Sequence, residues 1–92
     1  MTMLEKIEKL RNVQSFQDEL IDRLEIIIRG TSDPDCQTVC GIEIIDDEIL
    51  AKYLLNWSEE HIGYSSERIP IKWLEEGFDY KAAYEQKRKV GS

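Results

Sequence analysis

The sequence has few of the residues that usually mark a secreted, metal-binding or catalytic protein. It contains two cysteines, two prolines and a single histidine in 92 residues. A small secreted domain usually carries more cysteines, spaced farther apart than Cys36 and Cys40. A zinc site needs three or four ligands, whereas His61 is the sole histidine. We therefore expect two reduced cysteines that lie as small apolar side chains on one helical face, and neither a metal ion nor another cofactor.

Long hydrophobic runs are also missing. No stretch of the chain approaches the roughly 20 apolar residues that a membrane-spanning helix needs. The first ten residues include Glu5, Lys6, Glu8 and Lys9, and they lack the continuous apolar segment of a secretion signal. The chain is 41% apolar, which is enough for one hydrophobic core and too little for two at this length. We therefore expect a single cytoplasmic domain over residues 1–92.

Catalytic motifs are equally scarce. The five glycines are isolated from one another, and we find no phosphate-binding glycine pattern, no metalloprotease helix and no nucleophile elbow. His61 is the clearest candidate for general acid–base chemistry, and Glu59 and Glu60 precede it. On a helix, residues one and two apart point in different directions, so these carboxylates would not face the imidazole. The sequence therefore predicts a protein without enzymatic activity, although a site built from scattered carboxylates would leave no motif.

Helical periodicity dominates the sequence, because strict alternation of apolar and polar residues is nearly absent. In residues 1–29 the apolar residues form two stripes, rotated from each other by about a quarter turn. This offset is compatible with one long helix or with two helices that break near residues 12–15. Ser15 and Asp18 have the spacing of a capping box. The stripes are Met3, Ile7 and Leu10, then Val13, Phe16, Leu20, Leu24 and Ile27.

The middle of the chain carries the signals of two further helices. Residues 30–45 are expected to form a connector in which Asp33 caps a short helix, with Pro34 at its first position. Residues 42–45 are the one place where a short strand would fit. Over residues 46–63 the apolar residues cover most of the helical circumference, which predicts a central buried helix. Its widest face holds Ile49, Leu50, Tyr53, Leu54, Trp57 and His61.

The C-terminal part, residues 64–92, is expected to hold a loop and two short helices. Pro70 opens the first helix, where Trp73 is equally suited to the core and to a contact surface. Asp79 caps the second, whose last turn holds the basic cluster of residues 87–89, where cations favour the helix dipole. The overall prediction is an all-α fold, a compact bundle of about four to six helices.

Negative charge is concentrated in the middle of the chain. Residues 31–67 hold nine acidic side chains and a single basic one, Lys52. Such a surface repels nucleic acid and attracts a basic groove on another protein. It would also arise from helix caps and a solvated face that keeps the protein soluble. We predict a non-enzymatic, nucleic-acid-mimicking module that binds a protein partner with a basic surface. The predicted partner-binding residues are Asp33, Asp35, Glu43, Asp46, Asp47, Glu48, Glu59, Glu60, Glu67 and Trp73.

One segment resembles a known family. The sequence IPIKWLEEGF resembles the recognition-helix segment of excisionase-like helix-turn-helix proteins, in which a short helix with a tryptophan ends at Glu-Gly. This resemblance implies a small DNA-associated regulator over residues 65–89, in which the basic cluster contacts the phosphates of DNA. The general profile resembles accessory proteins of bacteriophages and other mobile elements, many of which inhibit host proteins. A third hypothesis is a self-associating structural protein, a homodimer whose seam is the N-terminal helix.

Overall fold

The chain folds into a three-stranded antiparallel sheet with helices packed on one side. The computed structural model describes the backbone of residues 2–58 and 61–91 and the side chains of residues 2–55 and 63–89. This α+β architecture contradicts the predicted all-α bundle. The elements in chain order are α1 (Met3–Leu10), α2 (Gln14–Thr31), β1 (Cys36–Ile45), β2 (Glu48–Ser58), β3 (His61–Pro70), the 3₁₀-helix η1 (Ile71–Leu74) and α3 (Tyr80–Gly91).

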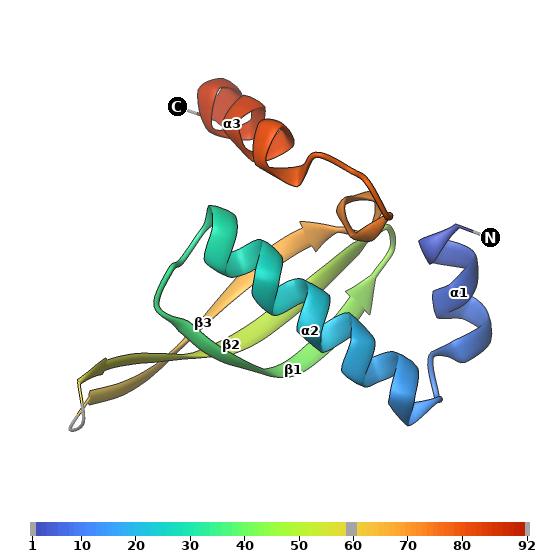
Figure 1. The fold of residues 1–92 in the computed structure, drawn as a ribbon, viewed down its shortest axis with the longest axis horizontal. Coiled ribbons are helices and arrows are strands. Elements are labelled where there is room, and N and C mark those ends of the chain that lie inside the picture. The colour runs from blue at the N-terminus through green and yellow to red at the C-terminus, as the bar shows by residue number, and fades with distance from the viewer. Residues whose placement is uncertain (1, 59–60, 92) are drawn as a thin grey trace.

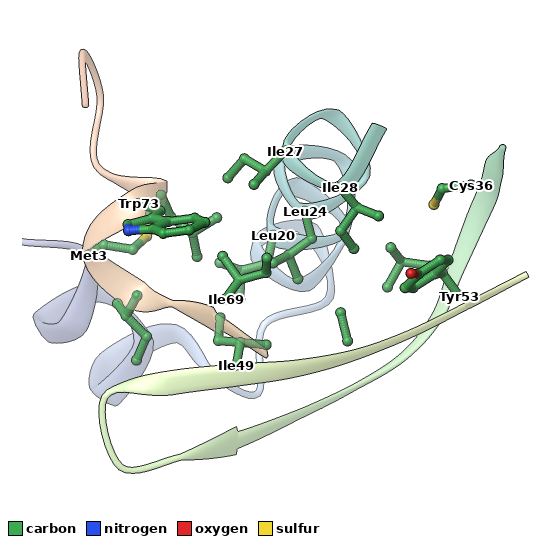
Figure 2. Packing of buried hydrophobic residues seen from close by; sticks show 14 of the residues in the cluster. Met3, Leu20, Leu24, Ile27, Ile28, Cys36, Ile49, Tyr53, Ile69 and Trp73 are labelled. Atoms are coloured by element: carbon green, nitrogen blue, oxygen red, sulfur yellow. The ribbon is translucent and has the colours of Figure 1, made fainter. Parts of the chain in front are cut away.

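The sheet has the strand order β1–β2–β3, and each strand is antiparallel to the next. Figure 1 shows α2 lying diagonally across one face of this sheet, which we call the inner face. The helix α1 contacts η1 at one end of the sheet, and α3 packs against α2. The opposite face, which we call the outer face, has no described helix across it (Figures 1 and 2).

The predicted central helix over residues 46–63 is wrong, because this segment forms the β1–β2 turn, β2 and the start of β3. Alternate residues of β2 point toward α2 and are at most 6% exposed. The outer positions between them include Leu50 and Leu54, so apolar residues stand on both faces of the strand. This pattern hides the period of two and imitates a helix that is apolar nearly all round. The buried residues are Ile49, Ala51, Tyr53 and Leu55.

The predicted short helix within residues 30–45 is also wrong, because β1 begins at Cys36. The buried residues Cys36 and Val39 are three positions apart, since register shifts interrupt the pairing of β1 with β2 near both of them. A spacing of three imitates the helical period. A strand was expected only at residues 42–45, whereas β1 extends from Cys36 to Ile45.

The connections between the strands are short. Asp46 and Asp47 form a two-residue turn between β1 and β2, and Asp46 has a positive φ of 54°, which aspartate tolerates better than most residues. The loop expected at residues 64–68 is instead part of β3, which pairs with β2 up to Pro70. The ladder continues into η1, because the N–H of Ile71 donates to the carbonyl oxygen of Asp47 at 2.8 Å.

The N-terminal segment forms two helices rather than one. Thr2 caps α1, since its hydroxyl accepts a hydrogen bond from the N–H of Glu5 at 3.3 Å. The second helix already begins at Gln14, so Ser15 does not act as its cap. The carboxylate of Asp18 instead accepts a hydrogen bond from the side chain of Gln14 at 2.9 Å. The break between the helices lets α1 turn away from α2 toward η1 (Figure 1).

The hydrophobic core lies between α2 and the inner face of the sheet (Figure 2). At one end of it, Met3 of α1 meets Trp73 of η1, and both are buried. Most residues of the N-terminal stripes therefore lie in the core of this chain, whereas Leu10 and Val13 remain exposed. From the helices the core takes Ile7, Phe16, Leu20, Leu24, Ile27 and Ile28, and from the sheet Cys36, Val39, Ile49, Ala51, Tyr53, Leu55 and Ile69.

The C-terminal elements return the chain to α2. Pro70 is followed directly by η1, and Gly77 has a positive φ of 81° at the turn that leads toward α3. The carboxylate of Asp79 accepts a hydrogen bond from the N–H of Ala82 at 3.1 Å and so caps the first turn of α3. Half-buried Tyr80 and Tyr84 then pack against the core.

Replacing Leu24 with alanine should lower the free energy of unfolding by about 2–5 kcal/mol, because truncation of a fully buried side chain leaves a cavity. The matched control is Ile26→Ala in the same helix, where the side chain is 50% exposed. Its cost should stay within about 0.5 kcal/mol. Urea denaturation followed by circular dichroism measures both. Equal losses would contradict the assignment of the inner face.

Candidate functional site

The fold divides the acidic residues of the middle segment into separate groups. Asp33 and Asp35 lie before β1, whereas Asp46 and Asp47 lie after it. The ten residues of β1 separate the two groups by about 30 Å. Glu67 lies on the inner face of β3, opposite a buried alanine of β2. The described carboxylates therefore do not form the single continuous surface that the charge count led us to expect.

Two acidic residues of the predicted site lie on the outer face, where they have basic neighbours. Leu50 lies opposite Glu43 of β1 on one side and opposite Arg68 of β3 on the other. Glu48 and Lys52 precede and follow Leu50 on the outer face of β2. Diagonal neighbours on a sheet are about 7–8 Å apart, so each acid has a base within reach. Leu50 is thus ringed by two negative and two positive side chains.

Asp33 has a local structural role in place of the helix cap that was predicted. Its carboxylate accepts a hydrogen bond from the N–H of Asp35 at 3.0 Å, and its carbonyl oxygen accepts one from the N–H of Cys36 at 3.2 Å. These bonds form a turn in which an aspartate side chain binds the backbone two residues on. The turn directs the chain from α2 into β1.

Trp73, the one aromatic residue of the predicted site, belongs to the core. Its side chain is 4% exposed and lies beside Met3. The Nζ atom of Lys87 lies 6.0 Å from the centroid of the Trp73 ring, within the range of a cation–π contact. This contact gives one residue of the basic C-terminal cluster a role in attaching α3. Trp73 is not available on the surface for a partner.

The segment that resembles an excisionase recognition helix forms only one turn of 3₁₀-helix. Ile71, Trp73 and Leu74 are buried, and Lys72 is the exposed residue of this turn. A recognition helix must present several side chains to the edges of bases in the major groove. Because three of its four residues lie in the core, η1 has no exposed face that could contact the bases of DNA.

The two cysteines have different surroundings and do not share one face, as was predicted for a helix. Both thiols are free, and Cys36 is buried whereas Cys40 is exposed. Burial raises the pKa of the Cys36 thiol. The guanidinium of Arg29 acts in the opposite direction, and the carboxylates of Glu25 and Asp33 add to the rise. Cys36 is therefore held as a neutral side chain of the core.

Tyr53 brings a hydroxyl group to the inner face of β2. Its side chain is buried and is hydrogen-bonded to Ser65, which lies directly opposite on β3. Burial raises the pKa of the Tyr53 hydroxyl, the bond to Ser65 lowers it in part, and the negative charges of Asp33 and Glu67 raise it further. Folding therefore favours the neutral phenol over the phenolate.

The catalytic candidate from the sequence, His61, is the first residue of β3 rather than the end of a helix. Its side chain lies outside the described part of the structure, as do the predicted site residues Glu59 and Glu60 and the side chain of Trp57. Among the described residues, no group of three histidine, cysteine, aspartate or glutamate side chains is placed to hold a metal ion.

The feature that the fold does create is the outer face itself. Its middle strand carries half-buried Leu50 and Leu54, with Ile45 of β1 beside the same face. Farther along, a shallow hollow of about 510 Å³ is lined by Cys40, Lys52, Tyr64, Ser65 and Ser66. Tyr64 is 73% exposed, more than any other large apolar side chain whose exposure is described. We take this face as the candidate binding surface.

This surface was missed in the sequence because Leu50 and Leu54 were assigned to a core helix. A signal for the correct fold was present, since Asp46 and Asp47 separate two apolar runs by two residues. That spacing is typical of a β-hairpin. Only the pairing of the strands shows which of the apolar residues face away from the core.

Because Cys36 and Tyr53 have raised pKa values when folded, the folded state retains protons that the unfolded state loses above the ordinary pKa of these groups. Their contribution to the free energy of unfolding should therefore be complete below that pH and decline as the pH rises toward the folded values. The double variant Cys36→Val/Tyr53→Phe should show a shallower decline in urea denaturation across the alkaline range.

The control for this experiment is Val39→Ala, which truncates a buried residue that does not titrate. It should lower the free energy of unfolding by the same amount at every pH and keep the slope of the unmodified chain. A double variant with an unchanged slope would contradict the protonation of these two buried groups.

None of the helices in the described residues is long and apolar enough to cross a membrane. In comparisons with known proteins, no family model, no curated protein and no solved structure matches the chain.

Proposed function

We propose that the chain is a non-catalytic protein-binding module whose binding surface is the outer face of the sheet. The observation that supports this most directly is the position of Leu50 and Leu54 on the middle strand, with no described helix over them. An antiparallel sheet with one solvated face usually carries polar residues there. Apolar residues on an uncovered face favour a partner that buries them.

The charges around Leu50 fit the anatomy of a protein interface, which has an apolar centre and a polar rim. Glu43 and Glu48 would accept hydrogen bonds from basic groups of the partner, and Lys52 and Arg68 would donate to acidic ones. The partner is therefore a protein that offers an apolar strip between charges of both signs. Its basic groups would oppose the exposed aspartates of the β1–β2 turn.

This proposal keeps the protein partner inferred from the sequence and leaves out nucleic-acid mimicry. A mimic of a phosphate backbone needs closely spaced negative charges along one surface. Here the described carboxylates of residues 31–67 are divided among the two ends of β1, the outer face of the sheet and the inner face of β3. We also propose a cytoplasmic location, because two free thiols, one of them exposed, suit a reducing compartment.

The substitution Leu50→Arg should weaken binding to the partner by at least about tenfold, because it places a charge at the apolar centre of the surface. The matched control is Ile26→Arg, which adds the same charge to a half-exposed aliphatic position on α2, away from the outer face. Immobilised chain would capture binding proteins from a bacterial lysate, and quantitative mass spectrometry would compare the variants with the unmodified chain.

Circular dichroism of both variants shows whether each keeps its fold. The expected result is that Ile26→Arg retains the captured protein and Leu50→Arg loses it. If Leu50→Arg captured the same protein with unchanged yield, the outer face would not be the binding surface.

A further inference from the structure

The two edge strands of the sheet differ in how they are covered. On β1, Arg29 of α2 donates hydrogen bonds to the carbonyl oxygens of Cys36 at 2.7 Å and Gln37 at 2.5 Å. The N–H of Val39 donates to the carboxylate of Glu25, also on α2, at 2.8 Å. Register shifts interrupt the same part of β1. Side-chain cover and irregular register both prevent another strand from pairing with this part of the edge.

Among the described residues, no side chain is seen to cover the edge of β3 in this way. Apart from β2, η1 is the one element with more than slight contact with β3 in the described chain. The pairing of β3 with β2 is regular from Gly63 to Pro70. A regular strand with an open edge offers its backbone groups to a further strand.

The alternation of hydrogen-bonded and non-hydrogen-bonded pairs between β2 and β3 shows which backbone groups of β3 point toward its open edge. The N–H of Ile71 donates to the carbonyl oxygen of Asp47, so this pair is a hydrogen-bonded one. Pairs that exchange hydrogen bonds alternate with pairs that do not, so Ile69, Glu67 and Ser65 direct their backbone groups toward β2. The residues whose N–H and C=O groups point toward the open edge are Tyr64, Ser66 and Arg68.

We propose that β3 pairs with β3 of a second copy of this chain, in an antiparallel register centred on Ser66, to form a continuous six-stranded sheet. Two-fold symmetry then places Tyr64 opposite Arg68 of the other copy at two positions. A guanidinium beside an exposed tyrosine ring makes a favourable cation–π contact. Glu67 lies opposite Ser65, whereas a register centred on Glu67 would bring two carboxylates together. The sequence of β3 is thus complementary to itself in one register.

The charge distribution is compatible with this pairing despite the net charge of −7 on each chain. Between Gly63 and Pro70, β3 carries one acidic and one basic residue. Antiparallel pairing also places the two β1–β2 turns, with Asp46 and Asp47, at opposite ends of the joined sheet. The pairing is independent of the proposed function, although it would join the two outer faces into one wider surface.

The substitution Ser66→Pro tests the pairing, because proline removes the N–H that points outward and leaves the hydrogen bonds between β2 and β3 in place. Sedimentation velocity over a wide concentration range should show a reversible dimer for the unmodified chain. Ser66→Pro should raise the dissociation constant of the dimer at least about tenfold. The matched control Ser66→Ala keeps the N–H and should change the constant by less than about threefold.

A second pair of variants keeps the test valid if Ser66→Pro fails to fold. Arg68→Glu replaces the cation opposite Tyr64 and should weaken the dimer, whereas Lys81→Glu makes the same charge change at an exposed position of α3 and should not. An unmodified chain that stays monomeric at the highest concentration would overturn the proposal, as would equal dimerisation of these two variants. A dimer of the unmodified chain together with unchanged partner capture by Leu50→Arg would contradict the proposed function alone.

Discussion

The packing of α2 on the inner face of the sheet is the constraint on which the rest of the molecule depends. A small sheet needs a packed apolar face to be stable in water. Leu24, Ile27 and Ile28 of α2 are fully buried against it, and each such side chain contributes about 1.5–3 kcal/mol. Both ends of the chain attach to this pair of layers, since α1 packs on η1 and α3 packs on α2.

The same helix explains the asymmetry of the sheet. From α2, Arg29 and Glu25 reach the backbone of β1 and occupy its edge, while β3 on the other side of β2 has no such neighbour in the described chain. No described helix lies across the outer face of the sheet. The two proposed interactions, one at the outer face and one at the edge of β3, both involve parts of the sheet that α2 does not cover. A small domain that leaves apolar residues there gains stability by association.

The sequence was a good guide to the helices and a poor one to the strands. The stripe of Phe16, Leu20, Leu24 and Ile27 predicts an amphipathic helix, and α2 has this buried face. Local patterns succeed there because a helix satisfies its own backbone. In β2, Leu50 and Leu54 face away from the core, so the alternation that reveals a strand is lost.

The candidate site was harder to predict for a related reason. Charge can be counted along a sequence, but whether Asp35 and Asp46 lie together depends on whether the segment between them is a compact helix or an extended strand. As β1, that segment holds them about 30 Å apart. Trp73 illustrates the same limit, since its burial depends on α1 returning to η1. Both outcomes depend on contacts between residues that are distant in the sequence.

One face of the sheet is packed under α2, and the other has no described helix over it. Methyl NMR with a soluble paramagnetic chelate tests it directly, because the chelate broadens only the signals of groups that it can approach. Strong broadening of the Leu50 and Leu54 methyl signals is expected at low protein concentration, with little effect on Leu24 and Ile49. Equal protection of all four residues would show that the outer face is covered, which would contradict an open face opposite α2.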